Sequence, residues 1–130
     1  MIRLSEEMIR QVDVSDIDVR EVSYDPTKPS FLVAAEFLSV LDEDRLVFLD
    51  DAVIAVSAWS RVQIWDVEGD QTFELSPGDF DPDVIQAGRL IPGIGCQLEG
   101  LSASRERWTT LVFREPKIDV LGSGFSKRPD

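Results

Sequence analysis

Residues 52–67 alternate with a period of two, and this pattern constrains the fold more than any other feature of the chain. The even-numbered positions between Ile54 and Ile64 are mostly apolar, whereas the odd-numbered positions become polar and aromatic toward the end of the stretch. Successive side chains of a β-strand point to opposite faces, so this stretch predicts a half-buried strand. Its length exceeds that of a usual strand, which predicts a bend near Trp59 and Ser60.

Short apolar segments separated by turn residues continue this pattern along the rest of the chain. The turns are rich in Asp, Gly and Pro, and Asp favours turns and caps over helices. We therefore expect a mainly β fold with a minor helical part: about seven short strands in an antiparallel β-sandwich or a partly open barrel. Ser5 is expected to cap a short N-terminal helix over residues 6–12, because two acids follow it in the first turn.

Several segments carry individual predictions. Residues 31–41 are apolar at both parities, which fits either a strand covered on both faces or a buried helix, and their aromatic and β-branched content favours the strand. Residues 45–49 predict a short strand that ends at an acidic pair. Residues 93–101 and 108–114 predict the last hairpin of the fold, and residues 68–70 predict a turn.

The chain is expected to form one compact domain over residues 1–121, followed by a flexible tail over residues 122–130. With 130 residues, of which 43% are apolar, it can bury a sizeable core without disulfides. The single cysteine, Cys96, has no partner in the chain. No apolar signal-peptide core and no run of about 18 apolar residues is present. These features predict a cytoplasmic protein that does not associate with membranes.

The charge balance excludes several classes of function. The chain has 13 Lys and Arg, 25 Asp and Glu and no His, which gives a net charge of −12. Direct nucleic-acid binding is disfavoured because it depends on clustered Lys and Arg, and an anionic membrane surface repels the same charge. The absence of His removes the commonest general base and the commonest zinc ligand. We therefore expect no enzyme, no catalytic residues, no cofactor and no metal.

Acidic motifs give no specific sign of metal or sugar chemistry. The nearest approach to a calcium loop begins at Asp79, but an EF-hand requires Gly and Glu where this chain has Val84 and Leu90. Paired carboxylates for glycoside hydrolysis carry little information, because 25 acids make some pair available in any fold. Solvated acidic turns are the simpler interpretation.

A recognition surface is the remaining possibility for function. Loops lie on the surface, so carboxylates in turns are expected to be exposed together and to attract a basic partner. Tryptophan and arginine near the end of the long alternating stretch are typical of interfaces. The alternative is that a second sheet or the N-terminal helix packs over the tryptophans and leaves Arg61 and Gln63 at the rim. The expected partner-binding residues are Asp42, Glu43, Asp44, Asp50, Asp51, Trp59, Arg61, Trp65, Asp79, Asp81 and Asp83.

These inferences favour a small acidic protein-binding domain that inhibits or regulates a basic protein partner. The most concrete version is a bacterial immunity protein that neutralises a nuclease-like toxin, since a protein that holds nucleic acid must itself be basic. A structural or accessory β-rich subunit of a larger assembly is the first alternative. A carbohydrate-binding module that uses the tryptophans is the second. The sequence leaves the oligomeric state open.

Overall fold

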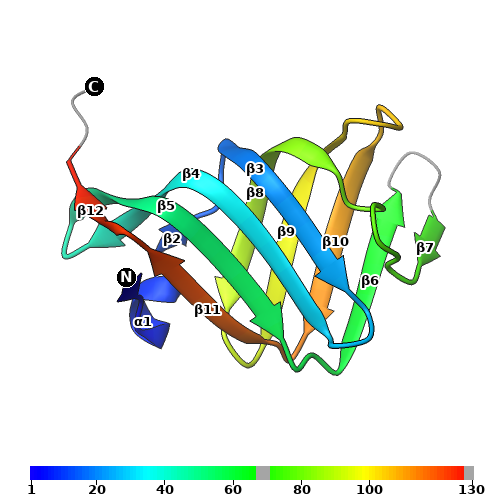
Figure 1. The fold of residues 1–130 in the computed structure, drawn as a ribbon, viewed down its shortest axis with the longest axis horizontal. Helices are drawn as coiled ribbons and strands as arrows, with labels where there is room; N and C mark the ends of the chain where they lie inside the picture. The colour runs from blue at the N-terminus through cyan, green and yellow to red at the C-terminus, as the bar shows by residue number, and fades with distance from the viewer. Residues whose placement is uncertain (67–70, 128–130) are drawn as a thin grey trace.

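The computed structural model shows one antiparallel β-sheet accompanied by a single helical turn (Figure 1). The structure describes residues 1–66 and 71–127. The elements in chain order are β1 (Ile2–Arg3), α1 (Glu6–Ile9), β2 (Val12–Asp13), β3 (Ile17–Asp25), β4 (Ser30–Asp42), β5 (Arg45–Ser57), β6 (Arg61–Asp66), β7 (Gln71–Phe73), β8 (Pro82–Ile91), β9 (Gly95–Ser102), β10 (Trp108–Arg114), β11 (Lys117–Gly122) and β12 (Gly124–Ser126).

Within the described residues, twelve strands belong to one open sheet. The strand order is β1-β11-β5-β4-β3-β8-β9-β10-β6-β7, with β2 paired to β4 and β12 paired to β5 beside this path. All of these pairings are antiparallel, which confirms the prediction of a mainly β, antiparallel fold. The predicted number of about seven strands is too low, because strands as short as β1, β2 and β12 carry no visible alternation. The predicted sandwich or barrel is instead a single continuous open sheet.

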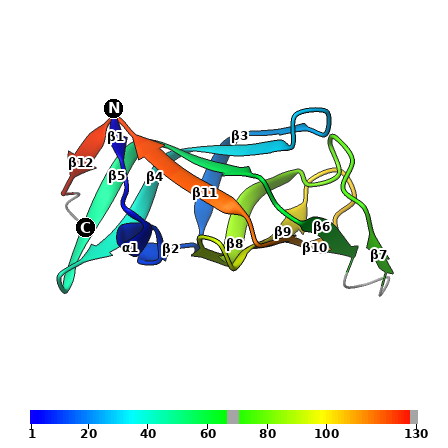
Figure 2. The same ribbon diagram turned by 90° about the horizontal axis from the view of Figure 1, so that it is seen from below.

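The sheet bends where β3 meets β8, so that its two halves face each other (Figure 2). The first half contains β1, β11, β5, β4 and β3, and the second half contains β8, β9, β10, β6 and β7. The β3–β8 ladder that joins them has only two residue pairs, one of which is Ile17 with Ile85. The core lies between the halves, where the ring of Phe31 on β4 is 5.1 Å from the ring of Phe113 on β10.

The long alternating stretch folds largely as its pattern predicts. Ala52, Ile54 and Val56 are buried on β5, and Ile64 is buried on β6. The predicted bend is confirmed, because β5 ends at Ser57 and β6 begins at Arg61. At this break the chain passes from the first half of the sheet to the second. The predicted last hairpin is also confirmed, as β9 and β10.

β4 and β5 form a hairpin of two strands with 13 residues each. Residues 31–41 are strand, as their aromatic and β-branched content favours. The prediction of a short strand over residues 45–49 is wrong, because β5 continues through Asp50 and Asp51 to Ser57. The acidic pair therefore lies inside a strand and does not form a turn.

The hairpin changes its buried face at Asp51, which has a positive φ of 47°. Ala35 and Ala52 are buried on one side of this position, and Leu38 and Leu49 are buried on the other. These two pairs have opposite parities along their strands, so a backbone irregularity must lie between them. Asp tolerates the left-handed conformation better than most residues. We call residues 37–42 and 45–50, beyond this irregularity, the distal hairpin.

The N-terminal segment covers the inner face of the distal hairpin (Figure 2). Ile9 of α1 and Val12 of β2 are buried there beside Val40 of β4. The predicted N-cap is confirmed, because the backbone N–H of Met8 donates a hydrogen bond of 3.2 Å to Ser5 Oγ. The helix spans only four residues, which is shorter than the predicted segment.

The C-terminal segment adds two strands that the sequence did not predict. β11 lies between β1 and β5, and β12 pairs with residues 48–50 of β5. Ser123 fixes the turn between them, because its N–H and hydroxyl both donate to the carbonyl oxygen of Asp50, at 2.8 and 3.2 Å. The tail expected from residue 122 onward is therefore paired sheet as far as Ser126. Residues 128–130 and the predicted turn at 68–70 lie outside the described residues.

No helix in the described ranges is long and apolar enough to cross a membrane.

Candidate functional site

The outer face of the distal hairpin carries four apolar side chains that no other element covers completely. Leu41 and Leu46 are cross-strand neighbours and are 46% and 54% exposed. Phe37 and Phe48 occupy the same face by strand alternation and are half-buried, with ring centroids 5.4 Å apart in an edge-on arrangement. We call Phe37, Leu41, Leu46 and Phe48 the outer apolar patch.

Carboxylates lie along the β2 and β3 side of this patch. A shallow surface pocket there is lined by Phe37 and Ser39 together with four acids and no basic residue. These acids are Asp13, Asp16, Asp18 and Glu36. Asp13 lies directly opposite Ser39 in the β2–β4 ladder and therefore shares the outer face of the sheet.

The tip of the distal hairpin adds the predicted acidic turn. Glu43 and Asp44 have φ values of 45° and 66°, and they join the paired residues Asp42 and Arg45 as a two-residue turn. Turns with two positive φ values match the twist of a hairpin and favour residues such as Asp. Within the described part of the chain, none of the three tip carboxylates makes an ion pair or a side-chain hydrogen bond.

The negative charge of the chain is concentrated in its first 51 residues, which include the distal hairpin. Residues 1–51 hold 13 acids and 5 bases, a net charge of −8, whereas residues 52–130 hold 12 acids and 8 bases, a net charge of −4. The first segment supplies α1, β2, β3, β4 and all of the distal hairpin. This uneven distribution along the sequence is a signal for the acidic segment that the acidic turns alone do not reveal.

Asp50 and Asp51 lie at the base of the distal hairpin, away from its tip. Asp51 Oδ1 accepts a hydrogen bond of 3.0 Å from the guanidinium of Arg20, and its Oδ2 accepts one of 3.1 Å from Ser123 Oγ. Asp51 therefore connects β3, β5 and the turn before β12. Asp50 is half-buried on the outer face beside β12.

Asp79 and Asp81 lie in the loop before β8, and Asp83 lies at the start of β8, in the other half of the sheet from the distal hairpin. The Asp81 carboxylate accepts hydrogen bonds from Ser102 Oγ at 2.5 Å and from the Ser104 N–H at 3.2 Å. Asp79 Oδ2 accepts one of 2.8 Å from the N–H of Ser76. Two of the three carboxylates thus hold the loop in place, and only Asp83 is exposed on the surface.

The environment of Asp81 favours its charged form. Partial burial opposes ionisation, but the hydrogen bonds from Ser102 and Ser104 and the nearby charge of Arg105 outweigh it and lower the pKa of Asp81. Arg105 also donates a hydrogen bond to the carbonyl oxygen of Asp79. The acidic loop is therefore tied to the β9–β10 loop through several polar contacts.

The predicted group of Trp59, Arg61 and Trp65 is divided between two places. The ring of Trp59 lies 4.7 Å from that of Phe113 and 6.1 Å from that of Tyr24, so Trp59 packs against the core, as the alternative interpretation holds. Arg61 is exposed at a groove of about 480 Å³ that Trp59 and Tyr24 also line. Trp65 is 44% exposed on β6, where Thr110 lies opposite it.

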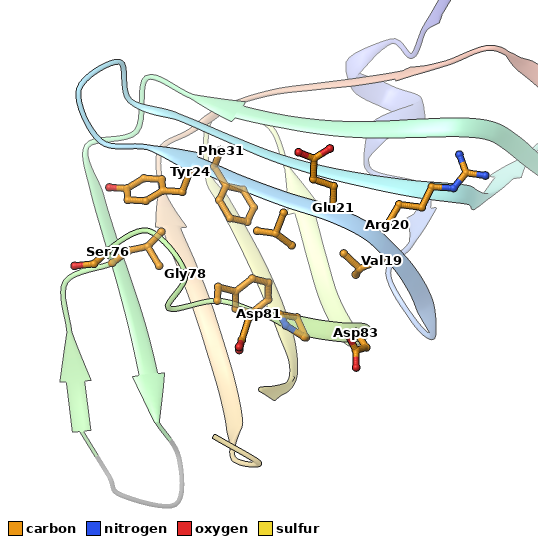
Figure 3. Close-up of a pocket in the computed structure, with 13 residues that line it drawn as sticks. Val19, Arg20, Glu21, Tyr24, Phe31, Ser76, Gly78, Asp81 and Asp83 are labelled. Atoms are coloured by element: carbon orange, nitrogen blue, oxygen red, sulfur yellow. The ribbon is translucent and has the colours of Figure 1, made fainter. Parts of the chain in front are cut away.

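A second groove, of about 240 Å³, opens between β3 and the loop before β8 (Figure 3). Val19 and Tyr24 line it from β3, and Ser76 and Asp83 line it from the other side. Glu21 also borders it from β3, with its carboxylate pointing away from the loop. Sequence reasoning did not find this groove, because it depends on where two segments far apart in the chain separate.

Cys96 and the carboxylates offer little chemistry beyond binding. Cys96 is 1% exposed, and burial raises the pKa of its thiol to about 12, so it is not a nucleophile at neutral pH. Across residues 1–66 and 71–127, no three Cys, Asp or Glu residues are grouped so as to hold a metal ion.

Comparisons with protein-family models, curated proteins and solved structures find no match to this chain.

Proposed function

We propose that this chain is a small acidic binding domain, without enzymatic activity, that docks a basic protein on the outer apolar patch. One observation carries the proposal: apolar side chains lie exposed on a sheet face, and the charged residues that line the pocket beside them are all carboxylates. Protein interfaces combine a desolvated apolar centre with a polar rim. A partner with Lys and Arg around an apolar centre would complement both parts of this surface.

Charge complementarity supports a basic partner over a second copy of this chain. A symmetric dimer formed through this face would bring carboxylates such as Asp13 and Glu36 of one copy near the acidic face of the other, and like charges across an interface are costly. A basic partner would gain from the same charges, because they accelerate association at low ionic strength.

The most concrete form of the proposal is a cytoplasmic bacterial immunity protein that neutralises a nuclease-like toxin. Such a toxin needs a basic surface to hold nucleic acid. An inhibitor gains if its acidic surface is preorganised before contact. The antiparallel pairing of the distal hairpin on both sides, with β2 and with β12, supports such a preorganised surface.

A double variant, Leu41→Asn with Leu46→Asn, tests the docking surface. The matched control is Leu101→Asn on β9, which removes a leucine that is 47% exposed on the second half of the sheet. The immobilised chain is used to capture protein from cells of the native host, and the captured protein is identified, purified and titrated at low and high salt. We expect a basic protein whose affinity falls with salt and falls about tenfold or more in the double variant, with no change in the control.

The opposite results would refute the proposal. Failure to capture a basic protein, or equal binding by the double variant, excludes docking at the outer apolar patch. Nuclease activity of the purified partner then tests the narrower version. We expect stoichiometric wild-type chain to inhibit this activity and the double variant to fail. A basic partner without nuclease activity would refute the immunity assignment and leave the binding surface intact.

A further inference from the structure

One edge of β3 has no partner strand along most of its length. β3 pairs with β4 from Val19 to Asp25, whereas its ladder with β8 ends at Asp18. No other described strand pairs with the second edge of residues 19–25. The exposed edge of a strand presents backbone N–H and C=O groups that can pair with another chain.

The edge remains open because the segment before β8 is held elsewhere. The β8–β9 ladder shifts its register between Pro82 and Ile85, where β8 diverges from β3. The preceding loop is tied to the β9–β10 loop by the bonds from Ser102 to Asp81 and from Arg105 to Asp79. These contacts keep the loop away from β3 and leave the groove of Figure 3 between them.

The groove has the character of a peptide-binding site. Its sides include Val19, Val22 and Tyr24, and its lining includes Phe31 and Phe80, whose rings are 6.2 Å apart. It is adjacent to the larger groove beside Trp59, because Tyr24 and Leu75 line both. Together the two grooves follow β3 toward its C-terminal end.

The charges in the grooves are mainly negative. Glu21 and Asp83 line the first groove and Glu74 lines the second, and in the described part of the chain none of them forms an ion pair. Arg20 lines the first groove, but its guanidinium is bonded to Asp51. The base in the second groove is Arg61. Apolar side chains with carboxylates beside them complement a peptide that alternates apolar and basic residues.

We propose that residues 19–25 of β3 form a strand-addition site for an extended segment of a partner protein with alternating apolar and basic residues. The added strand would pair its backbone with the free edge of β3 and direct alternate side chains into the groove. This site is separate from the outer apolar patch, so it does not depend on the proposed function.

The test uses a capped octapeptide of alternating valine and lysine as the probe. Binding is followed through the backbone amide signals of the ¹⁵N-labelled chain, which yield both affinity and location. Two further peptides carry N-methyl groups on alternate residues. In one of them the methylated residues are those whose N–H groups would pair with β3, and in the other they are those whose N–H groups would point away from β3. A third peptide replaces every lysine with glutamate. We expect shifts centred on residues 19–25 and about a tenfold or greater loss of affinity for the peptide methylated on the pairing edge. The glutamate peptide should also bind more weakly.

Protein variants separate groove binding from a general attraction to an acidic surface. Ser76→Trp fills the groove from an exposed position and should abolish binding, whereas Gln97→Trp on the exposed face of β9 should not. Glu21→Lys should weaken binding of the lysine peptide and strengthen binding of the glutamate peptide. Because Glu21 is exposed, Glu21→Lys should fold, and it provides the test if Ser76→Trp fails to fold.

Four results would overturn the proposal. They are no binding of the valine–lysine peptide, shifts centred elsewhere, equal affinity for every N-methylated peptide, and dimerisation of the chain through this edge in the absence of peptide.

Discussion

The two acidic turns of this chain, residues 42–44 and 79–83, are alike in sequence and different in the folded protein. Both place three carboxylates within five residues or fewer. At the hairpin tip, none of the carboxylates accepts a hydrogen bond from another described side chain. In the second turn, Asp79 and Asp81 accept hydrogen bonds from backbone or side-chain donors. An acidic turn is therefore available to a partner only where no neighbouring segment supplies donors.

The surroundings of the two turns explain the difference. The hairpin tip projects at one end of the molecule, where α1 is the nearest other element (Figure 1). The second turn lies against the β9–β10 loop, which contains Ser102, Ser104 and Arg105. This contrast gives four predictions, from the largest expected effect to the smallest.

Asp81→Ala should lower the free energy of unfolding by about 2 kcal/mol, because it leaves the buried Ser102 hydroxyl without its acceptor. Asp83→Ala, two residues away and exposed, is the matched control and should change stability by less than about 0.5 kcal/mol. Denaturant unfolding measures both. Equal effects of the two substitutions would remove the distinction between bonded and exposed carboxylates.

Acid should remove the contribution of Asp81 to stability. Because the pKa of Asp81 is lower in the folded than in the unfolded chain, the unfolded chain takes up a proton first as the pH falls. The stabilisation is complete above the unfolded-state pKa of about 3.9 and is lost as the pH falls through the folded-state pKa. The stability difference between wild type and Asp81→Asn should therefore be constant from about pH 7 to about pH 5 and should shrink as the pH falls below about 4. A constant difference would show that the charge of Asp81 is not what stabilises the loop.

Ser102→Ala should cost about 1 kcal/mol, because Ser102 is 1% exposed and its hydroxyl also accepts from the N–H of Arg105. Combined with Asp81→Ala, it should cost less than the sum of the two single effects, since both remove the same hydrogen bond. A double-mutant cycle in denaturant measures this coupling. Strict additivity would indicate that the two side chains act independently.

Neutralising the hairpin tip should leave stability nearly unchanged. The triple variant Asp42→Asn, Glu43→Gln and Asp44→Asn removes three charges, while Asn still tolerates the positive φ of residue 44. We expect a change within about 0.5 kcal/mol. The rate of association with the captured basic partner should fall at low salt and converge with the wild-type rate at high salt. A larger loss of stability would show that the tip carboxylates stabilise the fold, as Asp81 does, and would contradict the contrast between the two turns.

Local alternation was sufficient to predict the strands that bury one face. Ile54, Val56 and Ile64 follow their parity into the core, and the aromatic content of residues 31–41 correctly favoured strand over helix. The interpretation of Asp50 and Asp51 as a turn failed because a positive φ at one residue let the strand continue. Propensity alone does not reveal such an irregularity, since it depends on the packing of both faces.

The site was less predictable because its residues meet through distant pairings. Glu43 and Asp44 were correctly placed in a turn, which is a local property, and Asp42 is the last strand residue before it. Asp13 and Glu36 join the same surface only because β2 and β4 pair side by side. The sequence also gave no sign that the β9–β10 loop would supply donors to Asp79 and Asp81. Long-range contact therefore decides which carboxylates remain exposed.

The position of β11 between β1 and β5 has a consequence for how the protein is made. Ile118 and Val120 of β11 are buried, and Ile2 pairs with Gly122. During synthesis the N-terminal strand therefore has no neighbour until residues 117–122 have left the ribosome. β5, although translated much earlier, keeps an open edge until the same moment. The pairing of β1 and of this edge of β5 therefore waits for β11, and the nascent chain depends on holding the edge unpaired until then.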